Sequence, residues 1–258
     1  SEISFPDHLP KGVIQSVCRI HNGNWLIATG NGLFEWHPVR GIINTYYSNV
    51  SDPASLSNNN VIAVCQSEDQ VVWVGTRNGL SVIENPEPAI RLVRSIPGES
   101  GLQSRQVNAF AAYNDTLVWA GTSNGLHLID MEQELVTPWN SSSSNAYMSF
   151  PVEILSLYRD EEGVIWVGTK QDGVYRLTGS AVQPVLQKIS VPGAERLSVH
   201  CIRKDPTGRL WLGTSAKGLW RVDPDGSAPV IYSYQEDGTG LSHTYVFCLE
   251  ADTRDRMW

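Results

Sequence analysis

The stretch Trp73–Leu80 reads WVGTRNGL, and it returns along the chain with small changes. Similar strings begin at Trp119 (WAGTSNGL), Trp166 (WVGTKQDGV) and Trp211 (WLGTSAKGL), and Trp258 stands one further period on. The successive tryptophans are 46, 47, 45 and 47 residues apart. A fixed period of this length indicates a repeat architecture, in which each repeat is one supersecondary unit.

An earlier copy of the phrase is altered. In Leu26–Leu33 the position of the Trp is taken by Leu26 and the position of the Gly by Ala28. The Thr is kept, because Thr29 stands 47 residues before Thr76. The chain therefore holds five full copies of the repeat and the start of a sixth.

Every copy has the same internal order. A short apolar segment such as Ile154–Leu157 is followed by a polar turn such as Asp160–Gly163, then by the phrase, then by further β-rich pieces such as Val174–Leu177. No stretch of helical length shows a 3.6-residue apolar rhythm. Four short strands in each repeat of about 45 residues are typical of a β-propeller blade.

We therefore predict an all-β fold, a single β-propeller over residues 1–258 built from four-stranded blades with a 45–48 residue period. We expect five full blades and the start of a sixth, as part of a seven-bladed propeller, which would need roughly 325 residues at this period. The predicted blades span 12–47, 58–95, 104–137, 151–188, 196–234 and, in part, 243–258.

Within the phrase, the Trp is predicted to fill the space between blades and the Gly to let neighbouring blades approach closely. The cysteines Cys18, Cys65, Cys201 and Cys248 follow no metal-binding spacing, and each stands on a predicted first strand, facing like the neighbouring apolar residues. We expect buried free thiols that act as small hydrophobic side chains, with a disulfide as the alternative. The acidic turn 160–162 is expected to be solvated.

Composition excludes several classes of function. The net charge is −8 and the pI is near 5.2, so the chain lacks the basic surface that nucleic acid or an anionic membrane requires. No run of 18 apolar residues is present, and residues 1–5 lack the pattern of a signal peptide. We expect no nucleic-acid partner.

Binding residues are expected in the loops that enter the first strand and in those that join the second strand to the third. These two sets of loops share one face of a propeller. Loops on a rigid scaffold often carry the binding residues. The alternative is that these Asn and Ser residues only satisfy turn geometry. The candidate ligand-binding residues are Asn59, Asn60, Arg77, Asn78, Arg105, Asn124, Trp139, Tyr147, Lys170, Arg196, Lys217, His243 and Tyr245.

Two of these candidates lie in the long loop 137–150, whose Ser-rich centre suggests flexibility. Trp139 and Tyr147 suit stacking on a sugar face, although Trp139 could equally pin the loop to the body of the protein. Catalysis has little support, since no HExxH or GxSxG motif is present. His200 and His243 are the only acid–base candidates, and we expect neither catalytic residues nor a metal or cofactor.

The repeat pattern V-x-x-[IVF]…D-x-x-G-x-[IL]-W-[VIL]-G-T-x-x-G-[LV] resembles the two-component regulator propeller repeat. The lead-in segments DPASLSNNNV at 52–61 and DGTGLSHTYV at 237–246 are similar to the same family. The first copy departs from the pattern, and the third repeat has Tyr113–Thr116 in place of the Asp-Gly turn. In this family, propellers of this kind form the periplasmic sensor region of hybrid two-component histidine kinases of Bacteroides-like bacteria.

The resemblance implies a periplasmic, ligand-sensing and non-enzymatic module of an inner-membrane sensor histidine kinase. It implies a role in sensing oligosaccharides and regulating polysaccharide utilisation, with a small oligosaccharide-like ligand, contacts to other domains of the same sensor, and a homodimer in the full-length protein. The membrane would be reached only through segments outside this chain. The alternatives are a propeller enzyme of the lyase type, for which no His and Glu constellation can be assembled from the sequence, and a protein-interaction scaffold.

Overall fold

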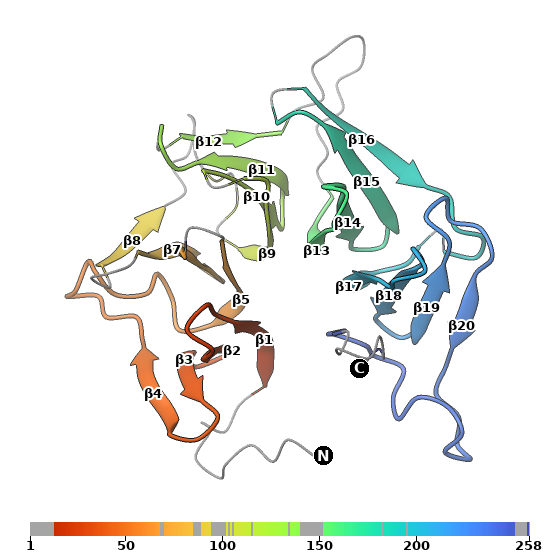
Figure 1. Ribbon diagram of the computed structural model, residues 1–258, viewed down its shortest axis with the longest axis horizontal. Coiled ribbons are helices and arrows are strands. Elements are labelled where there is room, and N and C mark those ends of the chain that lie inside the picture. The colour runs from red at the N-terminus through yellow and green to blue at the C-terminus, as the bar shows by residue number, and fades with distance from the viewer. Residues whose placement is uncertain are drawn as a thin grey trace. The chain divides into compact units, whose positions relative to one another are not determined.

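The computed structural model describes most of the chain, and every regular element in the described part is a strand (Figure 1). The described residues are 13–67, 70–84, 89–93, 102, 104, 106–114, 116–133, 135–139, 152–181, 183–194, 196–250 and 257. Within these residues there is no helix, so the predicted all-β class is confirmed.

The strands form five four-stranded sheets with the antiparallel, sequential order of propeller blades. The chain is a β-propeller with five such blades. The first blade holds β1 (Ile14–Arg19), β2 (Trp25–Thr29), β3 (Gly32–His37) and β4 (Gly41–Tyr46), and the second holds β5 (Val61–Gln66), β6 (Val72–Thr76), β7 (Gly79–Glu84) and β8 (Ala89–Val93). The third holds β9 (Val107–Ala112), β10 (Leu117–Thr122), β11 (Gly125–Asp130) and β12 (Leu135–Pro138), the fourth holds β13 (Ile154–Arg159), β14 (Ile165–Thr169), β15 (Val174–Gly179) and β16 (Pro184–Ile189), and the fifth holds β17 (Val199–Lys204), β18 (Leu210–Thr214), β19 (Leu219–Val222) and β20 (Val230–Tyr232).

The chain divides into two compact units, residues 1–110 and 111–258, and the boundary falls inside β9. Unit 1 holds the blades β1–β4 and β5–β8. Unit 2 holds the blades β13–β16 and β17–β20, and most of the blade that begins with β9.

The repeated phrase forms the second strand of each blade and the tight turn after it. Thr76 is fully buried, and its hydroxyl donates to the carbonyl of Gly79 at 2.9 Å while accepting from the amide of Asn78 at 3.1 Å. Thr29 and Thr122 make the same two bonds, and Thr169 and Thr214 donate to the corresponding glycine carbonyls at 2.7 Å. The Thr is therefore kept because its hydroxyl closes the turn into the third strand.

The Gly of the phrase lets the next blade approach, as predicted. A Cβ atom on Gly168 would lie 2.6 Å from the carbonyl oxygen of Val199, and one on Gly213 would lie 2.8 Å from that of Val246. In unit 1, a Cβ on Gly75 would lie 2.8 Å from the carbonyl oxygen of Val107. Backbone of the following repeat occupies the space that any other residue would need.

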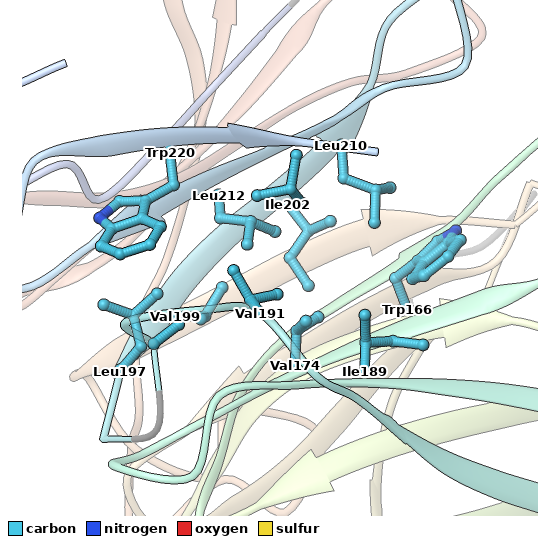
Figure 2. Packing of buried hydrophobic residues seen from close by; sticks show 12 residues of the cluster. Trp166, Val174, Ile189, Val191, Leu197, Val199, Ile202, Leu210, Leu212 and Trp220 are labelled. Atoms are coloured by element: carbon cyan, nitrogen blue, oxygen red, sulfur yellow. The ribbon is translucent and has the colours of Figure 1, made fainter. Parts of the chain in front are cut away.

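The Trp of the phrase packs where two blades meet. Figure 2 shows Trp166 among Val174, Ile189, Ile202 and Leu210, which come from two neighbouring blades of unit 2. Only 2% of Trp166 is exposed, and its indole Nε1 donates to Asp160 Oδ2 at 3.0 Å. Burying an aromatic side chain of this size is among the largest single contributions to a core.

The acidic turn 160–162 is not simply solvated, which corrects the expectation for Asp160. Asp160 is buried, and its Oδ2 also accepts from Lys204 Nζ of the next blade at 3.1 Å, while Oδ1 accepts from the amide of Val164 at 2.9 Å. Burial opposes ionisation, but the bonds from Trp166, Lys204 and Val164 outweigh it, so the pKa of Asp160 lies below its usual value. Asp160 thus joins two blades.

The four cysteines differ in burial, although the sequence predicts each to be buried on a first strand. The structure describes all four and links none in a disulfide. Cys201 is buried and burial raises its pKa to about 12, whereas Cys248 is exposed. The expectation of a buried thiol is therefore confirmed for Cys201 and wrong for Cys248.

The sixth blade stays a prediction. The described segment 243–250 holds no strand, but the Val246 amide donates to the Thr214 carbonyl at 3.0 Å and Leu249 is buried against Cys201 and Leu219. The segment thus lies against the last blade of unit 2.

We predict that Thr76→Val destabilises the protein by about 1–2 kcal/mol, because the swap keeps the shape of the side chain and leaves the Gly79 carbonyl without its partner. Urea unfolding followed by tryptophan fluorescence measures the change. Thr45→Val on the exposed face of β4 is the matched control, expected within about 0.5 kcal/mol of the parent. Equal effects of the two substitutions would contradict the hydroxyl's role.

We predict that Asp160→Asn costs about 2–3 kcal/mol near neutral pH, because Lys204 and the Trp166 indole lose a charged acceptor. A depressed carboxyl pKa contributes stability that is complete above the unfolded pKa of about 3.9 and is lost as the pH falls through the lower folded pKa. The difference between parent and variant should therefore narrow in acid. Urea midpoints across the acidic range test this, with the exposed neighbour Glu161→Gln as control; a difference independent of pH would refute it.

Candidate functional site

The predicted loop residues of unit 1 divide between structural and exposed positions. Asn59 Oδ1 accepts from the Ser48 amide at 2.6 Å, and its carbonyl accepts from Gly32 at 2.7 Å, so Asn59 ties β4 and β3 to the entry of β5. The carbonyl of Asn60 accepts from the Arg77 amide at 3.0 Å, while its buried Oδ1 has no hydrogen-bond partner among the described residues. Arg77 and Asn78 are exposed.

The predicted residues of unit 2 include three exposed basic side chains and one exposed amide. Lys170 Nζ pairs with Glu153 Oε2 at 2.7 Å, and the carbonyl of Lys217 accepts from the Trp220 indole at 3.0 Å. Arg196 and Asn124 are exposed. Lys170 also influences the pKa of His200.

Three predicted aromatic or basic residues do not contribute to a described site. Arg105 and Tyr147 lie outside the described residues. Trp139 is half-buried, packs against the core cluster of Trp119, Leu126 and Ile154, and donates its amide to the Leu126 carbonyl at 3.0 Å. Its position matches the alternative that it holds the loop to the body of the protein.

A β-bulge recurs in the first strand of four blades. In each of these strands it leaves one residue unpaired and changes the direction of that residue's side chain. In β17 the pairing moves from Val199–Thr214 to Cys201–Gly213, which leaves His200 unpaired. In β13, β1 and β5 the skipped residues are Leu155, Gln15 and Ile62. Bulges turn single side chains out of the regular alternation of a strand. His200 therefore occupies a position that the repeat sets apart from blade packing.

His200 begins a row of four rings in unit 2. Its ring centroid lies 5.0 Å from that of Phe247, in an edge-to-face arrangement. Phe247 stacks near Tyr245 at 5.8 Å, and Tyr245 lies 5.3 Å from His243. Phe247 and Tyr245 are 61% and 45% exposed, so the row is an open surface rather than part of the core. We call His200, Phe247, Tyr245 and His243 the aromatic row.

The charged pair Lys170–Glu153 lies near the His200 end of the row. Burial lowers the pKa of His200, Lys170 lowers it further and Glu153 raises it, and the net shift is downward. A lowered pKa keeps the imidazole neutral at physiological pH, with one donor and one acceptor nitrogen. The aromatic row therefore combines ring faces with a neutral imidazole and an accessible ion pair, which suits a ligand with apolar faces and hydroxyl or carboxylate groups.

Sequence reasoning found part of this arrangement. It named His243, Tyr245 and Lys170 as ligand contacts and His200 as an acid–base candidate, but it missed Phe247 and Glu153. Phe247 reads as a core residue of an apolar segment, although it stands 47 residues after His200 at the bulged position. The comparison of bulged positions between repeats is the signal that finds it.

Other features of the described residues supply no catalytic centre. No group of three His, Cys, Asp or Glu side chains in that part of the chain could hold a metal ion. A cavity of about 230 Å³ beside β16 is lined by Val174, Lys188, Ile189, Leu197 and Leu212 among others, and it has no acid–base pair.

The fold and the repeats together define a class. Five four-stranded blades built on one recurring turn make this chain a repeat-built β-propeller, and three of its repeats match the family model described as a two-component regulator propeller. The family model of that description matches residues 55–78, 150–171 and 195–216. The resemblance predicted from the sequence is thereby confirmed.

Solved structures share the fold at low sequence identity. The extracellular domain of a protein assigned as hybrid two-component system BT4673 of B. thetaiotaomicron aligns with a TM-score of 0.73 and 18% identity, over 98% of this chain and 33% of that one. The corresponding domain of BT3049 gives 0.64 and 16%, over 97% and 39%. This chain thus spans less than half of those chains. An inactive variant of virginiamycin B lyase from Staphylococcus aureus, solved with quinupristin, gives 0.65 and 14%, over 90% and 74%.

No curated protein matches the sequence significantly. In the described part of the chain, no helix has the length and apolar character needed to cross a membrane.

Proposed function

We propose that this chain is a ligand-sensing propeller module from the periplasmic region of a hybrid two-component histidine kinase, and that it binds an oligosaccharide on the aromatic row. The regulator-propeller repeats and the likeness to extracellular domains of hybrid two-component systems support the sensor role. The observation that carries the ligand class is the row of exposed rings beside the Lys170–Glu153 pair.

The chemistry of the row fits a saccharide. A pyranose presents C–H groups on its faces, which pack on aromatic rings, and hydroxyls on its rim, which bond to charged or amide groups. Tyr245 and Phe247 are nearly parallel, with 24° between their planes, and offer adjoining ring surfaces. Lys170 and Glu153 supply a donor and an acceptor near His200, at one end of the row.

In the full-length sensor, further domains would receive the signal, and a homodimer of the whole receptor would carry it to the kinase. The acidic net charge of −8 disfavours nucleic acid as a partner. The module itself performs no chemistry in this proposal, since a sensor needs only a difference in ligand affinity between two receptor states.

We predict that Phe247→Ala weakens binding of the responsive oligosaccharide about tenfold or more, because the substitution removes a ring of the row that is 61% exposed. The ligand is first identified by thermal shift against an oligosaccharide panel, since a ligand that binds only the folded state raises Tm. Isothermal titration calorimetry then gives Kd for parent and variant.

The matched control for this test is Tyr234→Ala, which removes an exposed aromatic ring outside the row. Its affinity should equal that of the parent. A panel that raises no Tm, or equal losses in the two variants, would refute the aromatic row as a saccharide site.

A second candidate function is a lyase-type enzyme. The structure places Glu153 close enough to His200 to influence its pKa, so a His and Glu pair exists where the sequence suggested none. The likeness to virginiamycin B lyase is the reason to test it. The sensor proposal predicts that quinupristin stays intact after incubation with the protein, as followed by liquid chromatography and mass spectrometry. Consumption of quinupristin that His200→Ala abolishes would establish the enzyme instead.

A further inference from the structure

A cavity of about 300 Å³ lies between the two blades of unit 1, and it contains a buried carboxylate. Glu35, on β3, is 8% exposed and lines the cavity together with Asn44 and Tyr46 of β4. Residues of the second blade, among them Gln66 and Gln70, complete the wall. The cavity uses no residue of the aromatic row.

Glu35 is held by neutral donors alone. Its Oε1 accepts from Asn24 Nδ2 at 2.6 Å and from Asn22 Nδ2 at a marginal 3.4 Å, and its Oε2 accepts from Asn44 Nδ2 at 2.6 Å. The Tyr46 hydroxyl is a further partner. Burial opposes ionisation of Glu35, but these bonds outweigh it and hold the pKa below its usual value, so the carboxylate is charged at neutral pH.

None of the ion pairs within the described residues involves Glu35. The hydrogen bonds therefore fix the carboxylate in place, and within the described part of the chain no cation forms an ion pair with it. A cationic group in the cavity would gain that attraction in a partly desolvated site, where it is stronger than in water. The long bond from Asn22 is the one that an incoming donor would replace at least cost.

The cavity arises from departures from the repeat, and packing requires none of them. In blades 4 and 5 a Trp bonds to the Asp six residues before it: Trp166 to Asp160, and Trp211 to Asp205 at 2.8 Å. In the first blade these two positions are Leu26 and Ile20, and both side chains line the cavity. Leu26 is smaller than the Trp of the other phrases, and neither Leu26 nor Ile20 can make the Trp–Asp hydrogen bond of blades 4 and 5.

The third departure is Glu35 itself. The residue paired with the phrase's Trp on the third strand is Arg176 for Trp166 and Arg221 for Trp211, and it is apolar in the second and third blades, where Val82 and Leu128 occupy it. Glu35 pairs with Leu26 at this position. Only the first blade carries a negative charge there, so the carboxylate is not a requirement of the blade.

The fourth departure is a strained residue at the edge of the cavity. Gln70 has φ of +70°, three residues before Trp73, where blades 1, 4 and 5 place glycines Gly23, Gly163 and Gly208 with φ between +81° and +87°. A side chain in this conformation is costly and persists where the surroundings or function require it. The Gln70 carbonyl accepts from Gln66 Nε2 at 2.9 Å, and Gln66 Oε1 in turn accepts from the His21 amide at 2.8 Å.

We propose that this cavity binds the protonated amine of a small hydroxylated molecule, of the size and chemistry of an amino monosaccharide, with Glu35 as the counter-ion. The amides of Gln66, Gln70 and Asn44 and the Tyr46 hydroxyl offer donors and acceptors for hydroxyl groups around it. Ile20 and Leu26 form an apolar wall for the ring. The volume lies at the lower end of ligand cavities, which run from about 300 to 1,000 Å³ and fit small molecules.

The test is calorimetric titration of the whole chain, at slightly acidic pH, with glucosamine, galactosamine and ethanolamine against their uncharged counterparts glucose, galactose and ethylene glycol. At least one amine should bind, and its uncharged counterpart should bind about tenfold more weakly or not at all, because a hydrogen bond to a charged group is roughly twice as strong as a neutral one. Absence of any amine-selective binding across the panel overturns the proposal.

Two variants locate the site. Glu35→Gln keeps the shape and removes the charge, and it should weaken amine binding about tenfold or more, whereas Glu132→Gln, an exposed carboxylate of unit 2, should not. Gln70→Gly restores the glycine of the other turns, so Tm should rise. Amine affinity should fall at the same time, and a residue with a purely structural role would not give these opposite effects. The proposal is overturned if Glu35→Gln binds the amine as tightly as the parent. If Glu35→Gln does not fold, unchanged amine affinity in Gln70→Gly overturns it instead.

Discussion

The close approach of one blade's first strand to the preceding blade's second strand is the constraint on which the structure depends. The carbonyl oxygens of Val199 and Val246 lie where a side chain on Gly168 or Gly213 would begin. Backbone packed on backbone at this distance admits glycine and nothing larger. The close approach also fixes which face of the strand each residue takes. Residues two positions from the glycine share its face, and the residues next to it take the opposite face.

Two further features of the phrase follow from that packing. The Trp two residues before the glycine shares its face and fills the wider part of the interblade space, as Trp166 does with 2% exposure. The Thr after the glycine points to the other face, where a buried hydroxyl needs internal partners. It finds them in the turn, since Thr76 bonds both to the Gly79 carbonyl and to the Asn78 amide. One phrase therefore sets the interblade distance and the start of the third strand.

These relations explain why the sequence predicts the strands and blade class so well, and the site less well. Each repeated residue performs one local task, and five copies make the task visible. The buried position of Asp160 is balanced by Lys204, which belongs to the next repeat. The acidic turn taken alone therefore predicts only a solvated side chain. The orientation of His200 depends on a bulge, which a period-two pattern does not reveal. Phe247 looks like any other apolar strand residue until it is compared with His200 at the same repeat position.

Two buried carboxylates, Asp160 and Glu35, differ in whether a cation balances their charge. Asp160 and Glu35 are both buried, and hydrogen bonds hold both pKa values below the usual range. Asp160 faces the Lys204 ammonium, so its charge is balanced within the fold and exerts little pull on anything else. Glu35 is balanced by amides and a phenol, which stabilise the carboxylate without cancelling its charge. A blade interface can tolerate the first arrangement anywhere that a cation is at hand. The second arrangement keeps an unbalanced charge beside a cavity, and it stands in the one described blade where Leu replaces the Trp of the phrase, opposite a turn that carries Gln70 in place of glycine.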